Sequence, residues 1–167
     1  MKKLLAALLL CLSAALVAAQ EAPDSTPFFA AKLIDPDEKP VAMTAYRGKP
    51  LVVNFWARWC PPCRAEIPEL NEFRKHHGGK IEVLGIAVED TTEADGVKAF
   101  ARDFPIRYPV FLAGGNAGTQ LMRTLGNPSG GLPYTLFIDR RGRVVGHKVG
   151  MLRQRDLDAV APRLLAP

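Results

Sequence analysis

Short hydrophobic runs alternate along the chain with segments of helical periodicity. Residues 51–57 form a mostly apolar run without strict alternation, which predicts a strand buried on both faces. Residues 60–77 then place Ile67, Leu70 and Phe73 at helical spacing, ahead of a pair of glycines that favours a helix end. We therefore expect a strand to run directly into a helix near residue 60.

A strand–helix–strand unit follows this first pair of elements. Residues 81–88 are apolar and β-branched, residues 97–104 carry apolar side chains at helical spacing, and residues 108–112 form a second apolar run. This alternation predicts an α/β fold with one sheet and helices on both of its faces.

The remaining patterns are shorter. They predict a hairpin or two edge strands over 28–33 and 41–46, a short helix over 119–125, an antiparallel hairpin over 135–139 and 144–149, and a C-terminal amphipathic helix over 157–165. Pro162 lies inside the last helix and is expected to kink it or end it early.

The N-terminus has the pattern of a secretory signal peptide. Two lysines precede an apolar stretch that is too short to span a bilayer comfortably, and small residues follow it. We predict a signal peptide over 1–19, a polar linker over 20–27 and one domain over 28–167. An uncleaved membrane anchor is the alternative.

Composition is that of a globular domain, with 48% hydrophobic and 23% charged residues among 167. The formal net charge is +5, and removing the two leader lysines leaves 20 basic and 17 acidic residues, a net +3. Acids and bases are interspersed, so the sequence has no basic footprint for nucleic acid.

Two cysteines remain after the leader, which contains Cys11 as an apolar filler. A disulfide between Cys60 and Cys63 closes a very short loop and adds little stability, so the pair is better explained by chemistry. At a helix start, Cys60 gains thiolate character and is expected to be exposed, while Cys63 lies one turn inside. Cys60 then attacks and Cys63 resolves the mixed disulfide, while Pro61 and Pro62 fit a first helical turn.

A zinc site is the main alternative for the cysteines. It would need two of His76, His77 and His147 as further ligands, but adjacent histidines on a helix point in different directions. The first two are better explained as the polar end of the helix. No cofactor is expected beyond the redox-active Cys60–Cys63 disulfide, and no metal.

The segment from Val53 to Pro68, with its Trp-Cys-Pro-Pro-Cys motif, resembles the active site of exported thioredoxin-like proteins of the TlpA/ResA/CcmG group. The likeness extends over nearly all of the mature chain, including residues 47–50 and 131–135. It implies a thioredoxin fold with an N-terminal β extension and an inserted strand–helix unit in the centre. It also implies thiol–disulfide oxidoreductase activity.

The resemblance assigns roles around the cysteines. It implies a cis Leu132–Pro133 bond, with Pro133 against the pair and backbone presented to an extended substrate; a strand-leading proline is the alternative. Trp59, Leu132 and Tyr134 are the expected client contacts, and Trp56 is expected in the core.

One departure concerns the acid that assists the second cysteine. Asn54 stands where cytoplasmic thioredoxin has a buried aspartate, and an amide cannot take the proton of Cys63. The exported group places an acid after the next strand, which here is Asp90 or, as fallback, Glu89. Two solvated acids capping the next helix are the alternative. Glu66 also resembles a recurring family position, although surface exposure explains it equally well.

The predicted function is reduction of disulfides in exported, periplasmic client proteins, with a membrane thiol–disulfide transporter as electron donor. Family clients include apocytochromes c and copper-site proteins of oxidase assembly.

Three alternatives stay open. An oxidant or isomerase would usually carry a histidine between the cysteines and a large helical insertion, and neither is present. A thiol peroxidase would place a threonine where Ala57 stands. A Cu(I) chaperone would bind metal through the two thiolates.

Overall fold

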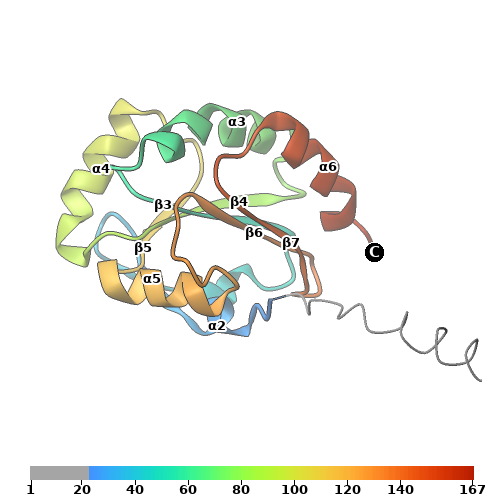
Figure 1. Ribbon diagram of the computed structural model, residues 1–167, viewed down its shortest axis with the longest axis horizontal. Coiled ribbons are helices and arrows are strands. Elements are labelled where there is room, and N and C mark those ends of the chain that lie inside the picture. Colours follow the sequence, from blue (N-terminus) through green and yellow to red (C-terminus); the bar gives the residue numbers. More distant parts are fainter. Residues whose placement is uncertain (1–22) are drawn as a thin grey trace, which may run out of the picture.

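A single mixed sheet runs through the computed structural model, which describes residues 23–167, so the predicted signal peptide lies outside the described residues (Figure 1). The strand order is β2-β1-β5-β4-β3-β6-β7. The strands are β1 (Lys32–Ile34), β2 (Pro40–Ala42), β3 (Leu51–Trp56), β4 (Glu82–Ala87), β5 (Val110–Leu112), β6 (Tyr134–Ile138) and β7 (Val144–Val149). The helices are α2 (Thr26–Ala30), α3 (Pro61–His77), α4 (Ala94–Asp103), α5 (Gly115–Thr124) and α6 (Gln154–Leu164), with short 3₁₀ turns η2 (Met43–Tyr46) and η3 (Thr91–Glu93).

Strand β3 lies deep in the sheet, and all six of its residues are buried. It pairs in parallel with β4 and antiparallel with β6, with Asn54 opposite Gly85 on one side and Thr135 on the other. Burial on both faces explains why the run lacks polar alternation. The predicted strand is confirmed, and it delivers the chain directly to the cysteines.

Helices cover both faces of the sheet, as predicted. Figure 1 shows α3 and α6 on one face and α2 with α5 on the other. One core cluster contains Phe28, Val53 and Phe55, and a second contains Val52 and Phe73. Neighbouring side chains of β3, such as Val52 and Val53, therefore pack on opposite faces of the sheet.

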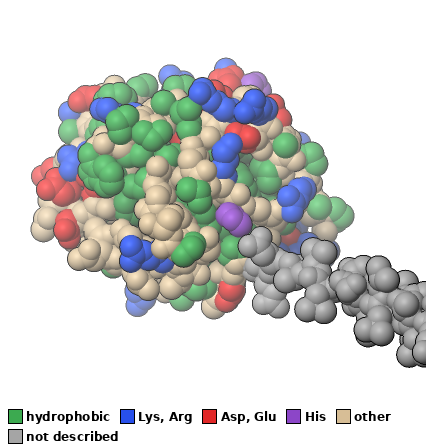
Figure 2. All heavy atoms as spheres, in the orientation of Figure 1, with side chains coloured by type: hydrophobic (Ala, Val, Ile, Leu, Met, Phe, Trp, Pro, Cys, Tyr) green, Lys and Arg blue, Asp and Glu red, His purple; other side chains and the backbone are tan. Residues whose placement is uncertain are grey.

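On the face drawn in Figure 2, acidic and basic side chains are interspersed.

The first predicted edge strand begins instead with a helix. Residues 26–30 form α2, which buries both Phe28 and Phe29. Adjacent residues of an edge strand would point to opposite faces, so a helical turn is what allows both phenyl rings to reach the core. Two short strands of the extension are present, with Leu33 of β1 paired to Val41 of β2, but residues 43–46 of the predicted second strand form the 3₁₀ turn η2.

Three helices differ from their predicted limits, and one of them is α6, which begins at Gln154, three residues before the predicted start, and runs through Pro162 to Leu164. Helix α4 ends at Asp103, so Phe104 lies just beyond it and is 41% exposed instead of joining a buried face. Helix α5 begins at Gly115, four residues before the predicted start. Its Gly118 packs so closely that an added Cβ would lie 2.9 Å from the Cβ of Ala113, and such contact outweighs the low helix propensity of glycine.

Candidate active site

The cysteines lie at the junction of β3 and α3. Cys60 is the N-cap of α3, and Pro61 and Pro62 occupy the first two helical positions, where a missing N–H costs little. The N–H of Cys60 donates to the Ala57 carbonyl at 3.1 Å, which closes the turn out of the strand. The N–H of Cys63 donates to Cys60 Sγ at 3.3 Å. Negative charge on this sulfur would therefore be stabilised by the helix N-terminus.

The two cysteines form a disulfide, with their Cα atoms 5.3 Å apart. Both residues are buried, Cys60 at 3% and Cys63 at 1% exposure, so the expected exposure of Cys60 is wrong for the oxidised protein. Its sulfur is bonded to Cys63, and Leu132 packs against the core cluster that contains both residues. Trp59, in contrast, is 69% exposed directly before the pair.

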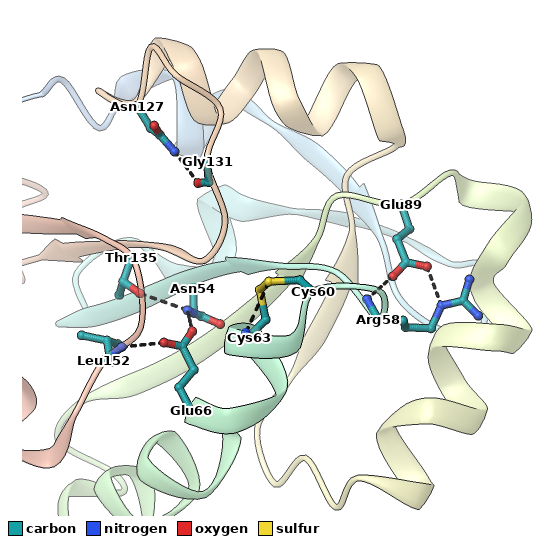
Figure 3. The surroundings of a disulfide bond; sticks show 10 residues. All are labelled: Asn54, Arg58, Cys60, Cys63, Glu66, Glu89, Asn127, Gly131, Thr135 and Leu152. Atoms are coloured by element: carbon teal, nitrogen blue, oxygen red, sulfur yellow. Dashed lines mark hydrogen bonds and ion pairs between the residues drawn. A yellow bond between two sulfur atoms is a disulfide. The ribbon is translucent and has the colours of Figure 1, made fainter.

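A buried carboxyl lies one turn after Cys63 on the same helix. Glu66 is fully buried, and its two oxygens accept hydrogen bonds from Asn54 Nδ2 and from the Leu152 N–H, each at 2.7 Å (Figure 3). Residues three apart on a helix share a face, which sets Glu66 beside Cys63. Burial raises the pKa of Glu66 to about 7, against the lowering effect of the two hydrogen bonds. Surface exposure of Glu66 is thus wrong.

Asn54 links this carboxyl to the sheet. Its Nδ2 also donates to Thr135 Oγ1 at 3.0 Å, so one amide joins β3, α3 and β6. Asn54, whose amide cannot accept a proton, therefore positions Glu66, whose carboxylate can. The helical spacing of Cys63 and Glu66 is the sequence feature that could have placed these two residues on one face of a helix. Nothing in the local sequence indicates the contact of Glu66 with Leu152, which is 86 residues away.

Glu89 follows β4 but has a partner of its own. The carboxylate is 6% exposed and accepts from both the backbone N–H and the Nε of Arg58, two residues before Cys60. Arg58 Nη2 also lies 2.6 Å from Glu93. Gly96 leaves room for this guanidinium, because an added Cβ there would lie 2.3 Å from Arg58 Nη1. Glu89 thus anchors the turn before the cysteines.

Within residues 23–167, Asp90 has no ion-pair partner such as the one that Glu89 has in Arg58. It is exposed and occupies the position before η3, where its side chain forms no capping hydrogen bond. Its backbone carbonyl accepts from the N–H of Glu93 at 2.9 Å.

The Leu132–Pro133 peptide bond is cis, as the resemblance implied, and Pro133 is buried. Leu132 is half-buried. The Tyr134 side chain is fully buried, and its hydroxyl donates to the Leu125 carbonyl at 2.6 Å. Because that ring is inside the core, the Tyr134 side chain is not accessible for the predicted client contact.

The sequence profile of the Redoxin family matches residues 18–161. The chain belongs to the Redoxin family. Among curated relatives, the thiol–disulfide oxidoreductase ResA of Bacillus cereus is 28% identical over 131 residues, 78% of this chain and 72% of that protein.

Solved structures of similar proteins agree with this assignment. A thiol:disulfide interchange protein of the thioredoxin family from Chlorobium tepidum is 30% identical, with a TM-score of 0.68, over 90% of this chain and 100% of that one. A DsbF homologue from Corynebacterium diphtheriae is 27% identical, with a TM-score of 0.68, over 88% of this chain and 89% of that one. This redoxin is a thiol–disulfide oxidoreductase of the ResA/CcmG group with a thioredoxin-like fold, as predicted.

Within the described part of this redoxin, no group of three or more histidine, cysteine or acidic side chains is arranged to hold a metal ion. The sulfurs of Cys60 and Cys63 are bonded to each other.

Replacing Glu89 with Ala should destabilise the redoxin by about 1–3 kcal/mol, because the Arg58 N–H and guanidinium lose their acceptor in a partly buried site. Urea unfolding of the oxidised protein measures this loss. Asp90→Ala is the matched control, and its exposed side chain should change the free energy of unfolding by less than about 0.5 kcal/mol. Equal effects of the two substitutions would refute the anchoring role of Glu89.

Proposed function

We propose that this redoxin reduces disulfides in exported client proteins. In the reduced enzyme, the Cys60 thiolate attacks one client sulfur, forms a mixed disulfide and releases the other client sulfur as a thiolate. Cys63 then attacks Cys60, which re-forms the Cys60–Cys63 bond and releases the second client thiolate. Two electrons pass to the client. The observation that carries this proposal is the disulfide at the N-terminus of α3, beside the exposed Trp59.

Cys63 must lose a proton before it can attack. Asp90 and Glu89 are the acceptors proposed from the sequence, but the contacts favour Glu66 in this role. Glu66 is buried one turn from Cys63, whereas Glu89 binds Arg58 and Asp90 is exposed. With a pKa raised to about 7 by burial, Glu66 changes protonation in the range where a general base is effective.

The surface around the cis bond supports binding of an extended client segment. Among residues 23–167, the backbone N–H and carbonyl of Leu132 have no hydrogen-bond partner, although the Pro133 carbonyl accepts from Gly150. Free backbone groups beside a cis-proline suit pairing with an added strand. The indole of Trp59 supplies an exposed apolar contact.

Export and the electron donor belong to the same proposal. The basic and apolar N-terminal pattern supports passage to an extracytoplasmic compartment, where client disulfides form. In residues 23–167, no helix has the length and apolarity to cross a membrane. A membrane thiol–disulfide transporter would return electrons to Cys60 and Cys63. Apocytochromes c and copper-site proteins are the proposed clients.

The reduction potential tests the direction of electron flow. We expect a value below about −200 mV, nearer to thioredoxin at about −270 mV than to the strong oxidant DsbA at about −120 mV. The neighbouring acid Glu66 disfavours thiolates in the reduced enzyme. Pro61 and Pro62 provide no positive charge between the cysteines that would stabilise a thiolate. Both features leave the reduced form less stable and so lower the potential. Equilibration in glutathione buffers, with thioredoxin as reference, gives the potential. A value near −120 mV would favour an oxidant and reject the reductase proposal.

A further inference from the structure

A groove of about 570 Å³ runs along α3 on the side that faces the chain just after α4. Its apolar surface includes Pro68 of α3 together with Phe104 and Pro105. Neither the disulfide nor the cis-proline lines it, so the proposed catalytic steps do not account for it.

The groove walls are held together by side-chain contacts. Asn71 Nδ2 donates to the Pro105 carbonyl at 2.7 Å, and its Oδ1 accepts from the Arg107 N–H at 2.8 Å. Arg74 Nη1 donates to the Arg107 carbonyl at 2.7 Å. These three bonds tie the segment after α4 to the active-site helix. The groove therefore exists before any partner binds.

An exposed aromatic ring marks the apolar part of the groove. Phe104 is 41% exposed and stacks on Phe100, with ring centroids 4.4 Å apart, so its orientation is fixed. The Arg64 guanidinium lies 5.8 Å from the centre of the Phe104 ring. A preorganised ring of this kind offers contact area at low entropic cost.

Charge in the groove is strongly one-sided. Four basic residues line it against a single acid, Glu72, which pairs with Lys75 at 3.3 Å. Within residues 23–167, no carboxylate lies within ion-pairing distance of the other three, Arg64, Arg74 and Arg107. An anionic partner would find three uncompensated positive charges around an apolar surface.

The groove starts next to the redox centre. Arg64 directly follows Cys63, and ten residues of helix separate it from Arg74, a rise of roughly 15 Å. An extended chain covers that distance in roughly four or five residues. A client cysteine at Cys60 would thus place residues a few positions away along its chain in the groove.

We propose that this groove binds an acidic client segment that carries an apolar side chain a few residues from the disulfide under attack. The acids face Arg64, Arg74 and Arg107, and the apolar side chain packs on Phe104. The inference rests on the proposed function and adds a substrate class to it: disulfides flanked by acidic residues are reduced in preference to others.

Two synthetic disulfide peptides test this preference with the reduced full chain. One carries two aspartates and a phenylalanine within roughly eight residues of a cysteine, and the other carries asparagines in place of the aspartates. We expect about a tenfold higher second-order rate for the acidic peptide at low salt, shrinking in roughly 0.5 M NaCl. The uncharged 2-hydroxyethyl disulfide should react at the same rate with the wild type, with Arg107→Glu and with Arg102→Glu.

Arg107→Glu should remove the preference for the acidic peptide, because the backbone bonds of this residue remain while its charge reverses. Arg102→Glu is the matched control: it makes the same charge change on an exposed side chain outside the groove, and should keep the preference.

The outcomes separate the two proposals. Equal rates for the two peptides, or equal effects of Arg107→Glu and Arg102→Glu, would overturn the groove assignment while reduction of 2-hydroxyethyl disulfide upholds the reductase. Failure to reduce that small disulfide would reject both. A dimer in sedimentation that Phe104→Ala dissociates would assign the groove to a second copy of the chain and overturn the client assignment.

Discussion

Replacing Cys60 with Ser should abolish disulfide reduction, lowering its second-order rate constant at least about a thousandfold. A serine hydroxyl at the start of α3 keeps the position but cannot displace a sulfur at neutral pH. The assay follows reduction of a disulfide peptide by stoichiometric reduced protein, so no external donor is needed. Folding is checked by urea unfolding, in which the variant should differ little because so short a disulfide loop contributes little stability.

Cys63→Ala should keep the first attack on the client disulfide and lose only the step that resolves the mixed disulfide. Cys60 can still attack, but nothing resolves the product, so a mixed disulfide with the client should accumulate and be seen on non-reducing gels or by mass spectrometry. Cys60→Ser should accumulate none. Both cysteines are buried in the oxidised protein, so what distinguishes them is position: Cys60 caps the helix, and Cys63 lies inside it. Mixed disulfides trapped through Cys63 in Cys60→Ser would reverse these roles.

Local patterns predict the parts of the fold that depend on neighbours in sequence. Strand β3 and the β6–β7 hairpin follow directly from apolar runs and turn residues. Helix α2 does not, because five residues are too few to show a period and because the burial of Phe29 depends on tertiary packing. The start of α5 is missed for a similar reason, since close contact with Ala113 overrides what Gly118 suggests by itself.

The site shows the same division. The cysteine pair stands out from spacing alone, and the cis bond before Pro133 was expected from family resemblance. The acids could not be assigned locally, because their state depends on partners far along the chain. Glu89 is held by Arg58, 31 residues away, and Glu66 meets the N–H of Leu152 across 86 residues. The sequence therefore identifies the reacting cysteines but does not identify which acids lie beside them and affect their reactivity.

Glu66→Gln should slow disulfide reduction at least about tenfold near neutral pH by removing the proposed proton acceptor of Cys63. In the wild type, the rate should rise with an inflection near pH 7, where Glu66 loses its proton. The variant should lack that inflection and keep only the rise due to the thiols. Stopped-flow rates from pH 5.5 to 8.5 measure both effects. Glu69→Gln, on the same helix, should retain the wild-type profile.

The pH dependence of the free energy of unfolding provides an independent test of the raised pKa of Glu66, and the direction of the expected change is known. Burial raises the folded-state pKa of this carboxyl from its ordinary 4.5 to about 7, so between these values the unfolded chain has lost the proton while the folded protein retains it. The contribution of Glu66 is therefore most favourable below pH 4.5, falls as pH rises to about 7, and is constant above. The total change is about 3 kcal/mol. Subtracting Glu66→Gln from wild type in urea unfolding cancels the other titrating groups and isolates this slope. A difference that stays flat from pH 4.5 to 7 would show that Glu66 titrates normally, and would remove the physical basis for its role as the base.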